Sequence, residues 1–230
     1  MDQEKKALLI LHQSRSSYGD VGIKLKQRGF ILDIKKPALG EKLPQNMNEH
    51  DLAVIYGGPM SANDENDAIK YETDWISVAL KSEKPFLGIC LGGQMLANNL
   101  GGSVQRAGDG SHEIGFFDII PHGEGLQVFQ DQKTFFQWHN EGFTVPKSCK
   151  ILARGEKFPE QAFQYSNAYG IQFHPEVNIR MHLAWLHYAA YKLKEPGAQT
   201  RIKQLNLRIK HGKKINMWLD HFLDNYLLKA

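Results

Sequence analysis

An apolar segment, Pro85–Ile89, runs through a cysteine flanked by glycines directly into a helix-forming segment. The pattern Gly88-x-Cys90-x-Gly92 has the spacing of a nucleophile elbow, in which two glycines let a strand turn sharply into a helix beneath a reactive side chain. At the start of that helix, Cys90 would lie near unpaired N–H groups and the positive end of the helix dipole, which favour the thiolate. The segment predicts a strand–turn–helix unit with a nucleophilic thiol, although a free cysteine taken alone is more often a small buried apolar residue.

A second apolar segment, Tyr169–Phe173, ends at His174-Pro175-Glu176. His174 can accept the proton of a thiol and return it to a leaving amine, while Glu176 can hold the imidazole in one tautomer. Taken alone, this triplet is more typical of a turn at the end of a strand with a carboxylate on the surface. Together with Cys90, it predicts a Cys–His–Glu catalytic site.

A third apolar segment, Leu52–Tyr56, runs into the turn Gly57-Gly58-Pro59. We expect the backbone N–H of Gly58 and that of Leu91, the residue after Cys90, to face the oxygen that becomes negative when a carbonyl carbon is attacked. A Gly-Gly-Pro turn by itself is a weak signal. Its significance here comes from the other two strand ends.

Strand-like and helix-like segments alternate in the first half of the chain. Strands are expected at residues 7–11, 30–34, 52–56 and 85–89, and helices at residues 20–28 and 67–81. Continuous apolar strands separated by helices indicate a parallel sheet covered on both faces, with sites at the carboxyl ends of the strands. Shorter strands, expected at residues 114–120, 133–138, 150–153 and 161–165, predict an added antiparallel or mixed β region on a flavodoxin-like α/β fold.

The C-terminal part is expected to be helical, first over residues 179–193 and then in a basic extension. We expect a main domain of residues 1–193 and an extension of residues 194–230. From Lys192 onward there are nine basic and three acidic residues, so this segment contains the whole positive excess of a chain with net charge +3. Such charge can attract nucleic acid or an anionic membrane, but apolar residues at helical spacing favour a stripe that packs on the domain or on a second subunit of a homodimer. That stripe comprises Ile215, Trp218, Leu219, Phe222, Leu223 and Tyr226.

Composition and the remaining motifs limit the other possibilities. The sequence has no run of eighteen apolar residues and no apolar stretch at its N-terminus, which predicts a cytoplasmic protein without a membrane span. Cys90 and Cys149 lie outside any C-x-x-C spacing, so we expect free thiols in a reducing compartment. No histidine pair has the spacing of metal ligands, and no phosphate-binding glycine loop is present, so neither a metal nor a cofactor is expected.

The chemical segments, in this order, resemble the class I (triad) glutamine amidotransferases from about Leu8 to Val177, and most closely their GMP-synthase-like branch. The resemblance implies that Cys90 is the nucleophile, His174 the acid–base and Glu176 its orienting group, with Gly58 and Leu91 forming the oxyanion hole. It further implies that substrate is bound by Gln94, Met60, Trp138 and His139. The matching segments are Gly57–Asp64, Gly88–Gln94, Glu113–Gly115, Trp138–Phe143 and Gln172–Glu176.

The resemblance implies hydrolysis of the side-chain amide of L-glutamine through a cysteine thioester. The sequence contains no nucleotide-activating loop, so we expect a synthase subunit on another chain to accept the ammonia. The segment from Trp138 to Glu141 differs from that of GMP synthases, which leaves the contact with a partner open. A γ-glutamyl peptidase acting on γ-glutamyl amides or peptides is the alternative enzyme, and a non-catalytic regulatory binding protein is the alternative from another class.

Overall fold

The first strand, β1 (Lys6–Ile10), shows how the sequence builds a two-faced sheet in the computed structural model, which describes residues 4–229. Ala7 and Leu9 belong to one hydrophobic cluster, whereas Leu8 and Ile10 belong to another, and all four are fully buried. Successive side chains of a strand point to opposite faces, so four consecutive apolar residues after Lys6 require the strand to be covered on both sides. The sheet therefore needs helices on both faces, as the sequence predicts.

The main sheet has a parallel half and an antiparallel half. The parallel half has the spatial order β2-β1-β3-β4-β12, and the antiparallel strands β11, β10 and β7 continue it beyond β12, with β9 and β5 attached through β11. This arrangement confirms the predicted α/β fold with an added β region. The remaining strands are β2 (Ile31–Lys35), β3 (Leu52–Ile55), β4 (Phe86–Ile89), β5 (Ser103–Arg106), β7 (Ile120–Pro121), β9 (Glu141–Thr144), β10 (Lys150–Arg154), β11 (Glu160–Tyr165) and β12 (Ala168–Ile171).

Two strands leave the main sheet, which the sequence did not predict. The expected single strand at residues 114–120 is divided into β6 (Glu113–Asp118) and β7, and only β7 pairs with β10. The first piece instead pairs with β8 (Thr134–His139) in a separate two-stranded sheet. The two pieces therefore have different partners, and β7 is only two residues long.

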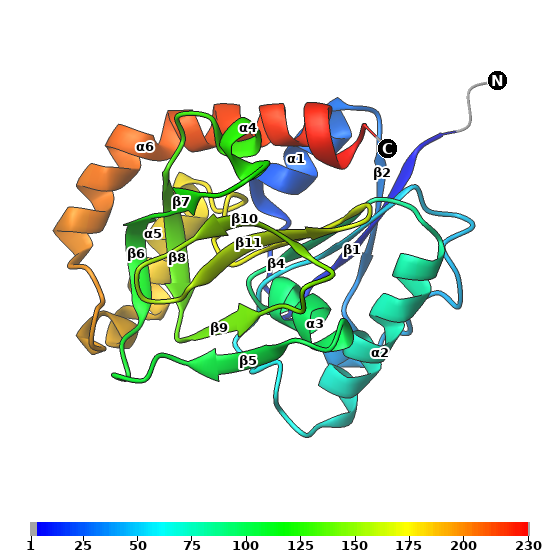
Figure 1. Ribbon diagram of the computed structural model, residues 1–230, viewed down its shortest axis with the longest axis horizontal. Coiled ribbons are helices and arrows are strands. Elements are labelled where there is room, and N and C mark those ends of the chain that lie inside the picture. The colour runs from blue at the N-terminus through cyan, green and yellow to red at the C-terminus, as the bar shows by residue number, and fades with distance from the viewer. Residues whose placement is uncertain (1–3, 230) are drawn as a thin grey trace.

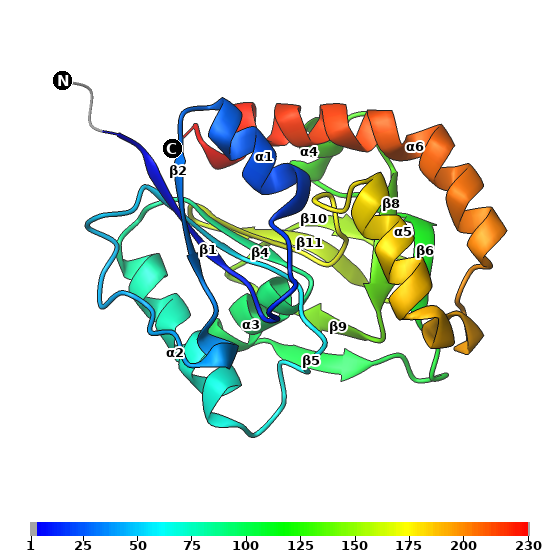
Figure 2. The same cartoon turned by 180° about the vertical axis from the view of Figure 1, so that it is seen from behind.

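Helices cover both faces of the main sheet. The helix α1 (Gly19–Gln27) lies beside α6 (Arg201–Phe222) on one face, while α2 (Asp67–Lys81) and α3 (Leu91–Asn99) lie on the other (Figures 1 and 2). The expected helix at 179–193 is interrupted, because α5 (Ile179–Tyr188) ends before Ala189 and a 3-10 helix, Ala190–Lys194, follows. Shorter elements are a 3-10 turn at Pro37–Leu39, the helix α4 (Gly125–Phe129) and a π-helical turn at Leu223–Leu227.

The predicted apolar stripe of the C-terminal segment packs on the same chain. Trp218 stacks on the ring of Phe129 with the two centroids 5.5 Å apart, and the stripe from Ile215 to Leu223 belongs to the same cluster as one face of β1. Ion pairs also join the polar side to the rest of the chain, because Nε of Arg28, which caps the C-terminal end of α1, lies 2.6 Å from Asp224 Oδ1. The alternative in which this stripe packs on a second subunit is therefore wrong.

The topology places three strand ends next to each other. Because β3, β4 and β12 are parallel neighbours, their carboxyl ends lie at the same edge of the sheet, where open α/β sheets bind ligands. The three turns that carry the predicted chemistry follow these strands. Within residues 4–229, none of the helices has the length and apolar character needed to cross a membrane.

Candidate active site

The turn between β4 and α3 holds Cys90 in a strained backbone conformation. Cys90 caps α3 with φ 50° and ψ −105°, a conformation that costs a non-glycine residue about 1–3 kcal/mol. The flanking glycines make the turn possible: a Cβ on Gly88 would lie 2.5 Å from the Gly92 carbonyl oxygen, and one on Gly92 would lie 2.2 Å from that of Ile55. Both distances are too short for any side chain, so the two glycines are required by the sharp turn that holds the thiol.

His174 and Glu176 meet as the sequence predicts, although the strand before them is shorter than expected. β12 ends at Ile171, two residues before the expected end of the strand. The backbone N–H of His174 donates to the carbonyl of Phe136 at 2.8 Å, which anchors the turn to β8. The ring nitrogen Nδ1 lies 2.8 Å from Glu176 Oε1, so Nδ1–H donates to the carboxylate and Nε2 remains for chemistry.

The electrostatics of His174 favour its charged form. Burial opposes a charge on the imidazole, but the charges of Glu176 and Cys90 outweigh it and raise the pKa of His174 to about 10. The Nε2 atom is buried and has no hydrogen-bond partner within residues 4–229. These charges therefore favour the protonated imidazole, and Nε2 is the ring nitrogen that does not face Glu176.

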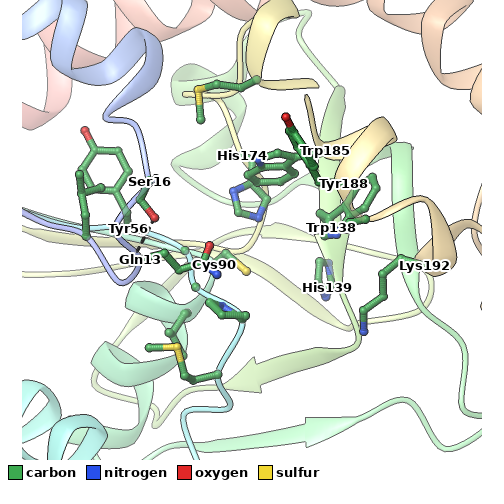
Figure 3. Close-up of a pocket in the computed structure, with 18 of the residues that line it drawn as sticks. Gln13, Ser16, Tyr56, Cys90, Trp138, His139, His174, Trp185, Tyr188 and Lys192 are labelled. Atoms are coloured by element: carbon green, nitrogen blue, oxygen red, sulfur yellow. Dashed lines mark hydrogen bonds between the residues drawn. The ribbon is translucent and has the colours of Figure 1, made fainter. Parts of the chain in front are cut away.

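Cys90 and His174 both lie beside the backbone of Gly57 and line the same cavity (Figure 3). A Cβ added to Gly57 would lie 2.7 Å from His174 Cε1 and 3.5 Å from Cys90 Cβ. Gly58 and Leu91 also line this cavity. As the first residue of α3, Leu91 has a backbone N–H without an intrahelical partner.

Gln94 lies in this cavity wall, but its amide nitrogen is already engaged. Gln94 Nε2 donates to the Glu141 carbonyl at 2.8 Å and to Gln172 Oε1 at 3.2 Å. The Gln172 amide in turn donates to Cys90 Sγ at 3.5 Å. These hydrogen bonds connect the thiol to the β region through two buried glutamines, a role for Gln172 that sequence reasoning missed although the residue stands within a matching segment.

The other predicted substrate contacts, Met60, Trp138 and His139, also line the cavity. The His139 side chain is committed to the protein, because its Nε2 lies 3.0 Å from Glu113 Oε2 and its Nδ1 lies 2.9 Å from the Glu141 carbonyl oxygen. Trp138 packs edge-on against Trp185 with the centroids 5.6 Å apart. Backbone atoms and Trp138, more than the His139 ring, are thus presented to the cavity.

The cavity has a volume of about 730 Å³, within the range of about 300–1,000 Å³ typical of sites for drug-sized molecules. Its outer wall comes from α5 and the following 3-10 helix and includes Trp185, Tyr188 and Lys192 (Figure 3). Trp185 packs on the His174 ring at 5.2 Å. No pattern in the sequence points to Lys192, whereas Trp185 stands four residues after the cavity-lining Met181 in a segment expected to be helical. In the described part of the chain, no three His, Cys, Asp or Glu side chains are placed to hold a metal ion.

Comparisons with known proteins identify the family and the fold of the chain. Residues 23–189 match the family described as glutamine amidotransferase class-I. The chain is 28% identical to the glutamine amidotransferase-like protein YfeJ of Salmonella typhimurium, over 95% of this chain and 96% of that protein. It is 31% identical to one subunit of the glutamine-hydrolyzing GMP synthase of Sulfolobus acidocaldarius, over 60% of this chain and 73% of that relative. The crystal structure of a glutamine amidotransferase from Thermotoga maritima superposes with a TM-score of 0.88 at 30% identity, covering 99% of this chain and all of that one.

Proposed function

Because this chain belongs to the glutamine amidotransferase class-I family, we propose that it hydrolyses the side-chain amide of L-glutamine through a thioester on Cys90 and supplies ammonia to an acceptor on another chain. One observation carries the proposal. The His174 ring is oriented through Nδ1 by Glu176 and leaves Nε2 unpartnered within the described residues, in the cavity that holds the strained Cys90.

The proposed reaction has two steps. The Cys90 thiolate attacks the amide carbon, the C–N bond breaks, and His174 gives its proton to the nitrogen, which leaves as ammonia. A water molecule then adds to the thioester, with His174 as the base, and releases glutamate and the thiol. Glu176 keeps the imidazole oriented and stabilises its charged form in both steps.

The oxygen of the attacked carbonyl becomes negative and needs donors. The backbone N–H groups of Gly58 and Leu91 serve as these donors, since both residues line the cavity beside Cys90. Donors fixed in advance stabilise the transition state because they need no reorganisation when the charge develops.

The relative from Sulfolobus acidocaldarius is named as one subunit of a synthase, which supports an ammonia acceptor of the same kind, a synthase on another chain. Copurification from native extract with the tagged chain tests this part. Recovery of a synthase-type ATP-dependent enzyme, together with glutamine-dependent amination of its substrate by the mixture, is the expected result.

A γ-glutamyl hydrolase is the second candidate, and the size of the cavity favours it. The wall beyond His174 carries the Tyr188 ring, which is 73% exposed, and the Trp185 ring. This leaves room for a leaving group larger than ammonia on the side from which His174 delivers its proton. The acyl half of the reaction would be identical.

Lys192 is proposed to bind the α-carboxylate of the glutamyl group. It lines the cavity together with Asn140 and Glu141, points inward (Figure 3), and forms no salt bridge within the described part of the chain. Because a charge-assisted hydrogen bond contributes about 1.5–3 kcal/mol, Lys192→Ala should raise KM for glutamine about tenfold and leave kcat within about twofold. Lys194→Ala, which removes an exposed lysine outside the cavity, is the control. With glutamine α-amide as substrate the Lys192 effect should vanish, and an equal loss with both substrates would refute this role.

Glutamate release by the purified protein tests the reaction and separates the candidates. Turnover of glutamine supports the amidotransferase, and preferred turnover of γ-glutamyl-cysteine or glutathione supports the peptidase. Cys90→Ser should lose at least about a hundredfold in rate, because an alkoxide is far harder to generate than a thiolate, whereas Cys149→Ser, at the other free cysteine, should keep it. No turnover of any γ-glutamyl compound, even with candidate partners present, would favour the non-catalytic binding protein.

A further inference from the structure

A second buried histidine–carboxylate pair lies behind the Gly57-Gly58 turn. His12 follows β1, and its Nε2 atom is 2.9 Å from Oε2 of Glu72 on α2. Both side chains are completely buried. The other ring nitrogen, Nδ1, lies 3.1 Å from the carbonyl oxygen of Gly57, so the pair contacts the backbone that the proposed oxyanion hole depends on.

Hydrogen-bond chemistry fixes the direction of the contact to Gly57. A carbonyl oxygen can only accept, so Nδ1 of His12 must carry a proton and donate it. One further proton is shared between Nε2 and the Glu72 carboxylate, whichever of the two atoms holds it. Both ring nitrogens of His12 are therefore engaged, and the ring cannot turn without breaking two buried hydrogen bonds.

The planar peptide transmits this constraint to the neighbouring N–H. The peptide bond between Gly57 and Gly58 is trans, as are all those described, so its C=O and N–H point in opposite directions. Holding the Gly57 oxygen on His12 directs the Gly58 N–H to the other side. Glycine on both sides of a peptide leaves it unusually free to rotate, and a rotated peptide would present an oxygen where an oxyanion must bind.

We infer that His12 and Glu72 form a positioning pair that locks the Gly57–Gly58 peptide with its N–H directed at the oxyanion. The inference rests on the proposed function. Packing supports it, because a Cβ on Gly58 would lie 3.0 Å from His12 Cγ and 2.9 Å from Leu91 Cδ2. The His12 ring and the Leu91 side chain thus both pack against Gly58, one of the two proposed oxyanion residues.

Two reactions of Cys90 test the inference, because only one of them forms an oxyanion. His12→Phe keeps a ring but removes the donor to Gly57. We expect kcat for glutamine to fall about a hundredfold, the loss typical of one missing oxyanion donor, with KM changed less than about threefold. Alkylation of Cys90 by iodoacetamide forms no oxyanion and should proceed at the wild-type rate.

A rescue variant and a matched control separate positioning from simple loss of a buried pair. In Glu72→Gln, the amide can donate to Nε2 of a neutral His12 whose Nδ1 still donates to Gly57, so most of the wild-type kcat should remain. His50→Phe removes another buried histidine with a carboxylate partner, Asp33 at 2.9 Å, outside the cavity. It should lower stability and leave kcat unchanged.

Unchanged kcat in His12→Phe would overturn the inference, and so would equal losses in turnover and alkylation, which indicate a general collapse of the site. The rate of glutamate release by the wild type tests the proposed function. The ratio of kcat in His12→Phe to kcat in the wild type tests the inference. If the wild type turns over no γ-glutamyl compound, the proposed function fails. The inference is then tested by the binding of glutamate γ-semialdehyde, an aldehyde that forms a thiohemiacetal on a cysteine, with its affinity compared between His12→Phe and the wild type. An affinity about tenfold lower in His12→Phe than in wild type supports the inference, and equal affinity overturns it.

Discussion

Two buried histidine–glutamate pairs lie beside the Gly57 backbone, and they differ in what the second ring nitrogen does. In the His174–Glu176 pair, Nδ1 faces the carboxylate at 2.8 Å and Nε2 has no partner within residues 4–229. In the His12–Glu72 pair, Nε2 faces the carboxylate at 2.9 Å and Nδ1 donates to the Gly57 carbonyl. The first arrangement leaves a nitrogen free to move protons, and the second uses both nitrogens to hold structure.

A third pair supports the same distinction. His139 contacts Glu113 and Gln137 through Nε2 and the Glu141 carbonyl through Nδ1. Both of its ring nitrogens are therefore engaged, although the residue lines the cavity. Burial and a carboxylate partner are therefore insufficient to identify an acid–base residue. An unengaged nitrogen beside a nucleophile is the distinguishing feature.

The largest effect should come from removing the unengaged nitrogen of His174. His174→Asn is expected to lower kcat for glutamine about a thousandfold, within the range typical of a lost general acid–base. It should also slow alkylation of Cys90 at neutral pH, since the imidazolium that stabilises the thiolate is gone. Steady-state glutamate release and the alkylation rate check both effects. A variant that loses turnover but keeps fast alkylation would remove the distinction between His174 and His12.

Removing the carboxylate charge from the same pair should have a smaller effect with a characteristic pH dependence. The pKa of His174 is about 10, since the charges of Glu176 and Cys90 outweigh burial. Glu176→Gln lowers that pKa, so the loss of activity on the alkaline side, expected near pH 10 in the wild type, should move to lower pH. At pH 8, kcat should fall about tenfold to a hundredfold, as a pH–rate profile would measure.

The same pKa makes a prediction about stability. Because His174 binds its proton more tightly in the folded chain, its contribution is complete below the unfolded pKa of 6.5 and is lost as the pH rises through about 10. Denaturant unfolding should show the wild type losing stability over this interval, and Glu176→Gln losing less. A decline of equal size in both proteins would contradict the assigned cause of the shift.

The smallest effect on activity is expected for the third pair. His139→Phe should raise KM for glutamine by only about twofold to fivefold and lower the free energy of unfolding by about 1–3 kcal/mol, because buried hydrogen-bond partners lose their donor. Kinetics and denaturant unfolding measure the two quantities. A loss of kcat as large as that of His174→Asn would show that a saturated histidine can still act on the substrate.

Local patterns were sufficient to predict the parallel half of the fold. The strands around Leu9, Val54 and Leu87 are apolar on both faces, and two-sided burial leaves a parallel sheet with helices as the solution. The pattern failed at residues 114–120, where one expected strand is divided into β6 and the two-residue β7, which have different partners. It also failed at Ala189, where a helix ends without a glycine or proline at the break.

Some residues of the proposed site could likewise be predicted from local sequence patterns, and others could not. The sequence predicts Cys90 with its two glycines, and His174 with Glu176, because the residues of each group are at most two positions from the cysteine or histidine. The His12–Glu72 pair is 60 residues apart in the chain, and neither residue has a neighbour that indicates its partner. Gln172 acquires its contact with the thiol only when β12 lies beside β4.

By itself, the sequence determined the sharp glycine turn at Cys90, the His-Pro-Glu turn and the alternation of apolar strands with helices, because steric and hydrophobic rules act over a few neighbouring residues. The tertiary structure alone decided that β12 inserts beside β4 with Ile171 opposite Ile89, so that the Cys90 N–H donates to the Ile171 carbonyl at 2.7 Å and the imidazole arrives beside the thiol. It also decided which of the three histidine–glutamate pairs keeps a ring nitrogen without a partner within residues 4–229, since that depends on acceptors that distant segments bring together.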